Sequence, residues 1–441
     1  MRLVRFTTSE IAEATGGRVA TGAAEVDGAT QDSRALKPGQ LFVPLVAERD
    51  GHDFIDSAIA NGAPAYFTHR QADPEPGAVA VVVPDTTDAL NDLARAARQR
   101  ISGPVIGITG SVGKTSTKDL LAGAVKDTFA THWSAKSFNN EIGVPLTLIN
   151  APDHSEVAII EMGARGIGHI STLCAVASPT VGIITTVAGA HTGEFGSIEN
   201  IALAKGELIE ALPKDGLSVL NGDNPLVSAM ASRSNAPVLT FGSDSGTNVR
   251  VTSVELDEDL RGTFILDTEW GTVTARPPTR GAHMATNVAA AVATALWLGV
   301  PIDAVEHGIA SAELSPWRMD VQRSASGALI INDSYNANPT SMSGALDSLG
   351  RLPQTNKVAV LGYMGELGDS ERDDHHQIAD AARAVGAELI AVGTDLYGVP
   401  HVKGADDALA QIGELDTNTA VLVKGSRSAG LETLAEQLLE R

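Results

Sequence analysis

Short runs of consecutive apolar residues recur along the middle and the last third of this chain. They fall into two series, with residues 105–109, 157–160, 181–184 and 217–220 in the first and residues 328–331, 358–361, 389–392 and 420–423 in the second. Runs of this kind, without polar alternation, are typical of strands buried on both faces of a parallel sheet. Each series therefore predicts a parallel sheet with helices between its strands.

The first part of the chain carries shorter signals of the same α/β type. The pattern predicts helices over residues 10–15, 53–61 and 85–100 and strands over residues 41–45, 65–68 and 79–83. Gly16-Gly17 would end the first helix, and Asp85 would cap the third. The turn-forming sequence Ile101-Ser-Gly-Pro104 then separates this region from the first series of buried strands.

We predict an α/β protein of three domains, which agrees with 441 residues at about 150 residues a domain. They are a small N-terminal α/β domain over residues 1–101, a central domain with a parallel sheet over 102–314, and a C-terminal Rossmann-like, doubly wound domain over 315–441. In the central domain, residues 249–273 alternate as antiparallel strands do, and an alanine-rich helix is expected over 284–298.

Charge and composition exclude several classes of protein. The formal net charge is −22, and a field of this sign repels nucleic acids and anionic membrane surfaces, so we expect neither as a partner. The longest uncharged run, 170–190, contains Ser178-Pro179 and indicates a helix end, a turn and a buried strand rather than a membrane span. A single cysteine, Cys174, excludes an intramolecular disulfide framework. We expect a soluble, cytoplasmic monomer.

The most specific motif is the glycine-rich sequence Gly110-Ser-Val-Gly-Lys-Thr-Ser116, which follows a buried strand. Glycines let backbone N–H groups approach phosphate oxygens, and the N-terminus of the following helix, expected over 117–125, adds partial positive charge. Lys114 would reach the β- and γ-phosphates, and the Thr115 hydroxyl would bind Mg²⁺. The central domain is thus predicted to be a P-loop domain that binds ATP or GTP. The expected binding residues are Thr109, Gly110, Ser111, Val112, Gly113, Lys114, Thr115 and Ser116.

Two possible metal ligands follow strands of the same predicted sheet. Glu161 comes directly after residues 157–160, and His191 follows a strand expected over 181–187. Each alone would be an ordinary loop residue, but the carboxyl ends of neighbouring parallel strands meet at the edge where ligands bind. Beside a P-loop, the two residues therefore predict a metal site. Lys205, taken by itself, has the pattern of an exposed helix lysine.

The order of the motifs resembles that of a known family. The motifs are Thr109–Ser116, Asn139-Asn-Glu-Ile-Gly-Val-Pro145, Glu161-Met-Gly163, Ala190-His191 and Ala204-Lys205. They occur in this order in the Mur ligases, ATP-dependent amide ligases of peptidoglycan precursor synthesis. Three further segments, Asp32-Ser-Arg34, Asp333-Ser-Tyr-Asn-Ala-Asn-Pro339 and Lys424-Gly-Ser-Arg427, extend the resemblance over all three domains. They are similar to the family member that joins D-alanyl-D-alanine to UDP-N-acetylmuramoyl-tripeptide.

The resemblance implies ATP and Mg²⁺ as cofactors and assigns residues to them. Thr115 and Glu161 would bind a first Mg²⁺ and His191 a second. Lys205 would be carbamylated, because CO₂ converts an amine into an N-carboxylate that can bridge to a metal. Asn287 resembles an adenine contact, Arg318 an arginine that meets the γ-phosphate, and Asp333 a ribose contact. The implied catalytic residues are Lys114, Lys205, His191 and Arg318, and the implied metal ligands are Thr115, Glu161, His191 and Lys205.

The resemblance also implies two substrates and an acyl phosphate between them. Ser33 and Arg34 would lie near the uridine diphosphate, and Asn139 and Asn140 would face the muramoyl-peptide. The residues implied on the D-alanyl-D-alanine side are Asn336, Asn338, Lys424, Ser426 and Arg427.

Two alternatives remain at this point. One is the preceding ligase of the family, which adds the third amino acid of the peptide; the other is a P-loop nucleotide switch that is not a ligase. The chain also departs from the family at Tyr363, where similar ligases have an acidic residue. Glu366 could substitute for that residue or be an ordinary surface side chain.

Overall fold

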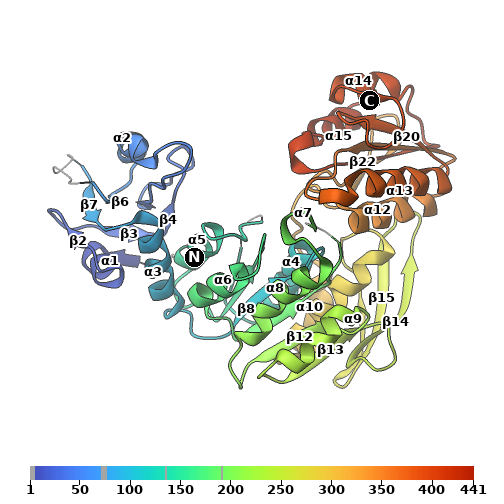
Figure 1. Cartoon of the computed structure of the whole chain (residues 1–441). Helices are drawn as coiled ribbons and strands as arrows, with labels where there is room; N and C mark the ends of the chain where they lie inside the picture. Colours follow the sequence, from blue (N-terminus) through green and yellow to red (C-terminus); the bar gives the residue numbers. More distant parts are fainter. Residues whose placement is uncertain (1–4, 71–76, 135–136, 190–191) are drawn as a thin grey trace.

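Three α/β units follow one another along the chain in the computed structural model, from blue through green and yellow to red in Figure 1. The structure describes residues 5–70, 77–134, 137–189 and 192–441. The predicted fold class, three α/β domains of which two are built on large parallel sheets, is confirmed. The strands of each large sheet fall within one predicted domain range, and the domain boundaries themselves stay predictions.

The N-terminal unit has a five-stranded sheet of order β2-β7-β6-β5-β4 and a separate antiparallel pair, β1 and β3. The elements are β1 (Arg5–Thr7), α1 (Thr8–Thr15), β2 (Arg18–Val19), β3 (Glu25–Asp27), β4 (Ala29–Thr30), β5 (Leu41–Phe42), η1 (Gly51–Phe54), α2 (Ile55–Ala60), β6 (Ala65–Thr68), β7 (Val79–Val82) and α3 (Thr86–Arg98). Asp85 caps α3 as predicted, since its carboxylate accepts from the backbone N–H groups of Thr87 and Asp88. The helix predicted over 53–61 is wrong in form, because a 3₁₀ turn precedes the shorter α2.

The central unit is built on a nine-stranded sheet of order β16-β15-β14-β13-β12-β11-β8-β10-β9. Its strands are β8 (Val105–Thr109), β9 (Thr131–Trp133), β10 (Val157–Glu161), β11 (Val181–Ile184), β12 (Leu217–Asn221), β13 (Val238–Gly242), β14 (Val249–Leu256), β15 (Gly262–Thr268) and β16 (Gly271–Ala275). Its helices are α4 (Lys114–Val125), α5 (Gly143–Ile149), α6 (His169–Ala177), α7 (Thr192–Phe195), α8 (Ile198–Glu210), α9 (Pro225–Ser228), η2 (Ala229–Arg233), η3 (Ala282–Met284), α10 (Ala285–Trp297) and α11 (Ile302–Ala310).

The pairing within this sheet places the predicted site. Strand β8 lies between β10 and β11, and all three run parallel, so the segments that follow them meet at one edge. Strands β14, β15 and β16 add the predicted antiparallel extension. One face of the sheet packs against α4, α10 and α11, and the other face against α5, α6 and α8.

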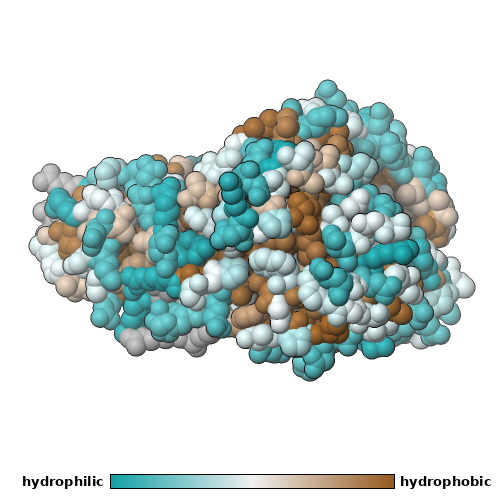
Figure 2. All heavy atoms as spheres, turned by 90° about the horizontal axis from the view of Figure 1, so that it is seen from below, coloured by the Kyte–Doolittle hydropathy of each residue, from teal (hydrophilic) through white to brown (hydrophobic). Residues whose placement is uncertain are grey.

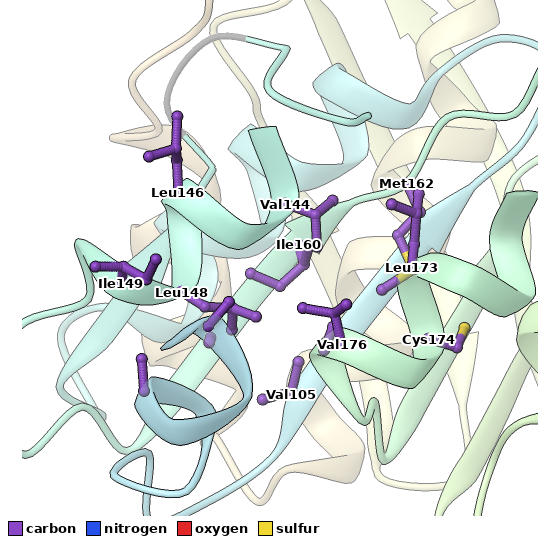
Figure 3. Packing of buried hydrophobic residues seen from close by; sticks show 14 of the residues in the cluster. Val105, Val144, Leu146, Leu148, Ile149, Ile160, Met162, Leu173, Cys174 and Val176 are labelled. Atoms are coloured by element: carbon purple, nitrogen blue, oxygen red, sulfur yellow. The ribbon is translucent and has the colours of Figure 1, made fainter. Parts of the chain in front are cut away.

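The N-terminal and central units share one hydrophobic core. A single cluster of buried side chains runs from Phe6 and Leu93 of the first unit to Val144 and Ile160 of the second. Helix α3 packs directly against α5 and α6. Figure 3 shows Val144, Ile160 and Val176 gathered at this junction, from α5, β10 and α6. Burial of this kind stabilises the two units as one body, at about 25 cal/mol for each Å² of apolar surface removed from water.

The C-terminal unit is a second doubly wound sheet, of order β17-β18-β22-β19-β20-β21. Its elements are β17 (Asp320–Arg323), β18 (Leu329–Asn332), α12 (Pro339–Arg351), β19 (Asn356–Gly362), η4 (Gly368–Ser370), α13 (Glu371–Ala384), β20 (Ala387–Val392), β21 (His401–Val402), α14 (Ala405–Gln411), β22 (Thr419–Lys424), η5 (Arg427–Ala429) and α15 (Glu432–Leu439). Alternate residues of the strands pack under α12 and α13 on one face and under α14 and α15 on the other. The strands predicted here are confirmed to within a few residues at their ends.

The surface of the molecule is mixed in character. Figure 2 shows hydrophilic residues over much of one face, with hydrophobic areas gathered mainly over the larger part of the molecule. Within the described ranges, no helix combines the length and the apolar character that crossing a membrane would need.

Candidate active site

The glycine-rich loop joins β8 to α4, and its two glycines have conformations that other residues rarely adopt. Gly110 has φ of 153° and Gly113 φ of 87°. A Cβ at Gly113 would lie 2.4 Å from Oδ1 of Asn287, and one at Gly110 would lie 1.9 Å from Oγ1 of Thr185. Both positions therefore require glycine. The prediction that the helix begins at residue 117 is wrong: Gly113 caps it, and Lys114 is its first residue.

Hydrogen bonds to the segment that follows β11 hold the loop in place and leave the N-terminal end of α4 to face a ligand. Ser111 donates its backbone N–H to the Thr186 carbonyl at 2.8 Å and its hydroxyl to the Ala188 carbonyl at 3.0 Å. The Thr185 hydroxyl donates to the Val112 carbonyl at 2.6 Å. Backbone N–H groups at the start of α4 have no acceptor within their own helix, so this end is suited to phosphate oxygens.

Lys114 lies over the loop that it follows. Its ammonium donates to the Gly110 carbonyl at 2.7 Å. Burial lowers the pKa of Lys114, the nearby Glu161 carboxylate opposes this, and the Arg318 guanidinium lowers the pKa further. A cation held with little water around it, beside glycine N–H groups, is suited to an anion such as a triphosphate.

Thr115, one residue further, shares its hydroxyl with a buried carboxylate. It donates to Oε2 of Glu161 at 2.8 Å, and the Asn139 amide donates to Oε1 of the same carboxylate at 2.8 Å. Glu161 is the last residue of β10 and is fully buried, rather than lying just beyond the strand as expected. A hydroxyl and a single carboxylate are hard oxygen ligands that fit Mg²⁺, which is usually held by one or two carboxylates together with substrate phosphates. No group of three or more acidic, histidine or cysteine side chains suited to a metal is found in the described part of the chain.

Arg318 reaches the same hydroxyl from the segment that leads into the C-terminal unit. Its Nη2 lies 3.0 Å from Oγ1 of Thr115 and 3.4 Å from Oγ of Ser137, and the guanidinium stacks over the Tyr335 ring at 4.2 Å. Its Nε is buried and has no hydrogen-bond partner among the residues described. A buried donor of this kind is costly unless a ligand or water pairs with it, so the side chain is ready to receive an anion.

The backbone on either side of Arg318 is strained. Trp317 has φ of 60° and Met319 φ of 50°, left-handed values that cost roughly 1–3 kcal/mol for each such residue. Such conformations persist only where neighbouring contacts impose them.

Lys205 is the residue for which the interpretation from the sequence alone was wrong. It lies on α8 and its side chain is buried, with a relative exposure of 2%. Burial and the charge of Lys114 lower the pKa of Lys205 to about 7. The expected second ligand, His191, lies outside the described residues, as does Ala190 of the same motif.

The remaining expected nucleotide contacts flank the loop. Asn287 on α10 is buried, with its Oδ1 3.5 Å from the Thr117 hydroxyl and against Gly113. Asp333 follows β18, where its Oδ2 accepts from the Lys424 ammonium at 2.6 Å and its Oδ1 accepts from the Met319 N–H at 3.1 Å. Asp333 thus holds in place the segment that carries Arg318.

The residues expected to bind the two other substrates lie in all three units. Ser33 is buried, with its carbonyl accepting from Asn61, while Arg34 is 87% exposed beside Asp32. Asn140 is exposed and accepts from the N–H of Gly143 at the start of α5. In the C-terminal unit, Lys424 also donates to the Asn336 carbonyl, Asn338 caps α12, the Ser426 hydroxyl accepts from the Gly365 N–H, and Arg427 pairs with Glu432.

Comparisons with known proteins cover the whole chain. Residues 25–98 match the model for the Mur ligase family catalytic domain, residues 108–295 the Mur ligase middle domain, and residues 317–427 the Mur ligase glutamate ligase domain. The UDP-N-acetylmuramoyl-tripeptide–D-alanyl-D-alanine ligase of Escherichia coli is 34% identical, over 99% of each chain. The chain belongs to the Mur ligase family.

Solved structures of Mur ligases agree with this membership. The crystal structure of MurF from Acinetobacter baumannii superposes with a TM-score of 0.90 at 30% identity, over all of both chains. MurF from Thermotoga maritima, solved in complex with ADP, has a TM-score of 0.81 at 26% identity and covers 93% of this chain and 96% of its own. The family resemblance predicted from the ordered motifs is therefore confirmed.

Ser137 of this Mur ligase site was missed from the sequence, whereas Tyr363 and Glu366 were singled out. Ser137 contacts both Thr115 and Arg318, yet a serine in a loop carries no distinguishing pattern. The hydroxyl of Tyr363, at a position usually acidic in similar ligases, donates to the Glu371 carboxylate, so an acid still lies beside this position. Glu366 has φ of 67°, and its carbonyl accepts from the Gly193 N–H of the central unit at 3.2 Å.

Proposed function

We propose that this Mur ligase joins D-alanyl-D-alanine to UDP-N-acetylmuramoyl-tripeptide at the expense of ATP, giving UDP-N-acetylmuramoyl-pentapeptide. The observation that carries the proposal is the convergence of Glu161 and Arg318 on the Thr115 hydroxyl, at the end of a P-loop. The full-length similarity to ligases named for this reaction supports the choice of substrates. The location proposed with it is the cytoplasm, and the proposed state is a monomer.

The reaction requires two anions to meet. The terminal carboxylate of the tripeptide attacks the γ-phosphorus of ATP, ADP leaves, and the resulting acyl phosphate is attacked by the amine of the dipeptide. Phosphate then leaves from the tetrahedral intermediate. Lys114 and Arg318 flank the place where the γ-phosphate would lie, so their charges offset the repulsion between carboxylate and triphosphate and stabilise the transferring group. No side-chain nucleophile is needed, and the buried Cys174 has a pKa raised by burial to about 12.

The oxygen ligands at this site fit Mg²⁺, which when bound neutralises phosphate charge. Thr115 and Glu161 would hold it, and Asn139 would keep the carboxylate oriented. We place Ser111, Gly113, Ser116 and their neighbours in the loop around the phosphates, Asn287 beside adenine and Asp333 beside ribose. His191 and a carbamylated Lys205 complete the proposed metal site.

The direct test measures phosphate release from Mg²⁺-ATP with UDP-N-acetylmuramoyl-tripeptide, in the presence and absence of D-alanyl-D-alanine, with mass spectrometry of the product. We expect release to require both substrates and the product to be a pentapeptide. Amide formation only with UDP-N-acetylmuramoyl-dipeptide and a single diamino acid, in place of the tripeptide precursor and D-alanyl-D-alanine, would indicate the preceding ligase instead. Steady ATP hydrolysis at a rate that does not depend on either of the other two substrates would indicate a nucleotide switch.

Carbamylation of Lys205 should depend on pH in a defined direction. The neutral amine attacks CO₂, a C–N bond forms, and a proton is released, so only the deprotonated lysine reacts. Because the pKa of Lys205 is lowered to about 7, the amine is free above this pH and protonated below it. We expect a ¹³C signal of a carbamate when the protein is equilibrated with ¹³C-bicarbonate at pH 8, with a progressive loss as the pH falls through 7. Absence of the signal at pH 8, or its persistence in Lys205→Ala, would refute the assignment.

A further inference from the structure

The segment that carries Arg318 between the two units is tied down on both sides. On the C-terminal side, the Met319 N–H donates to Asp333 and the Trp317 carbonyl accepts from the Tyr335 N–H at 3.2 Å. On the central side, the Ser315 N–H donates to Oδ2 of Asp119 at 2.7 Å. These contacts fix both ends of residues 315–319, the segment whose left-handed backbone presents Arg318.

Asp119 lies on the same helix as the residue that Arg318 contacts. Thr115 and Asp119 are four residues apart on α4 and therefore lie on one face of it. Ser315 and Arg318 are three residues apart on the segment that crosses that face. The two hydrogen bonds, from Arg318 to Thr115 and from Ser315 to Asp119, thus join the same two elements side by side.

The burial of the Asp119 carboxylate in the middle of α4 calls for an explanation, because a buried carboxylate is costly unless it is paired. Asp119 is only 4% exposed, and its Oδ1 lies 3.2 Å from the Lys118 ammonium, which itself donates to the Ser134 carbonyl at 2.9 Å. Both residues lie on α4 beyond the loop that would hold phosphate. Asp119 does make one contact with the other unit, the hydrogen bond from Ser315.

We propose that Asp119 is a positioning residue, which holds the Ser315–Met319 segment on the P-loop helix and thereby sets Arg318 on the γ-phosphate position. This rests on the proposed function for the assignment of Arg318 to the γ-phosphate. The carboxylate has one oxygen for Lys118 and one for Ser315. Asparagine keeps its shape but has a single acceptor oxygen, so it can satisfy only one of these two donors.

The first measurement is nucleotide affinity, by calorimetry with AMP-PNP and with ADP, which lacks the γ-phosphate. Asp119→Ala and Asp119→Asn should weaken AMP-PNP binding by roughly tenfold to a hundredfold, since a hydrogen bond to a charged group is lost, and leave ADP binding unchanged. Equal weakening of both nucleotides would mean that α4 is simply damaged, and would overturn the proposal. Should the alanine variant not fold, the asparagine variant decides in the same way.

The second measurement is a double-mutant cycle with Arg318→Ala, read both as AMP-PNP affinity and as kcat for amide formation. If Asp119 acts through Arg318, the double variant should be no more impaired than Arg318→Ala alone. Effects that multiply would overturn the proposal. Asp85→Ala, which removes a helix cap far from the site, is the control for a general loss of stability and should leave both readouts unchanged. If the wild type forms no amide while the affinity cycle shows coupling, the proposed function fails and the positioning role stands.

Discussion

Replacement of Lys114 by methionine should lower kcat/KM for amide formation by about a thousandfold. The Lys114 ammonium lies 2.7 Å from the Gly110 carbonyl of the loop. It is the cation proposed to stabilise the negative charge of the phosphoryl group during its transfer. Loss of one preorganised donor at a site of developing charge costs roughly a hundredfold to a thousandfold, and here a full charge is lost as well. Methionine preserves the length and apolar stem of the side chain. Initial rates of phosphate release over a range of ATP concentrations give kcat/KM and measure the effect.

Two variants sharpen the interpretation of this result. Lys126→Met, at the other end of α4 and paired with Glu313, should retain wild-type activity. Lys114→Arg keeps the charge but not the shape and should recover only part of the loss. An active Lys114→Met enzyme with an unchanged KM for ATP would show that the P-loop lysine does not take part in the reaction.

Lys205→Ala should reduce the rate by at least roughly a hundredfold, because it removes an anionic group proposed to hold the metal site together. In the wild type, a lowered pKa keeps a large fraction of Lys205 neutral near pH 7, which is what reaction with CO₂ requires. The measured quantities are kcat and the Mg²⁺ concentration that gives half of the maximal rate. We expect this Mg²⁺ concentration to rise as well, since an alanine side chain cannot bind a cation.

Chemical rescue separates this role from simple loss of packing. A short carboxylate such as acetate or propionate can occupy the space left by Lys205→Ala and should restore part of the activity, while the corresponding amine should not. Lys214→Ala, an exposed lysine beyond the same helix, should behave as the wild type. Full activity in Lys205→Ala without any additive would remove the carbamate from the mechanism.

Several parts of the site could be predicted because local sequence determines them. Gly110 and Gly113 mark a turn that only glycine allows, and a parallel sheet brings the end of β10 to that turn. Glu161 was found by this reasoning, and the two bonds that it accepts agree with it. The strands of both large sheets were also predictable, since buried parallel strands are continuous apolar runs.

The burial of Lys205 could not be predicted because it depends on tertiary packing. Helix α8 packs closely on the sheet where β8 and β11 carry glycines: a Cβ at Gly107 would lie 2.8 Å from Leu208 Cδ1, and one at Gly182 3.1 Å from Leu208 Cγ. That close approach buries a face of α8 that looks amphipathic in sequence. Asp119 and Ser137 were missed for a similar reason, because their partners are Ser315 and Arg318, far away along the chain.

The shared core between the first two units limits how this enzyme could have been assembled from separate parts. One buried cluster contains Phe6 and Leu93 of the first unit and Val144 and Ile160 of the second. The side of the first unit that faces α5 and α6 is therefore apolar and is not a surface suited to contact with water. An exchange of that unit for another nucleotide-binding module would leave apolar side chains of both helices without partners, and natural recombination at residues 101–104 would produce such chains. The C-terminal unit is under a similar constraint, because Leu256 and Leu260 of the central unit pack against its core. A replacement unit at either end of this architecture would therefore have to carry apolar side chains that match those of the central unit.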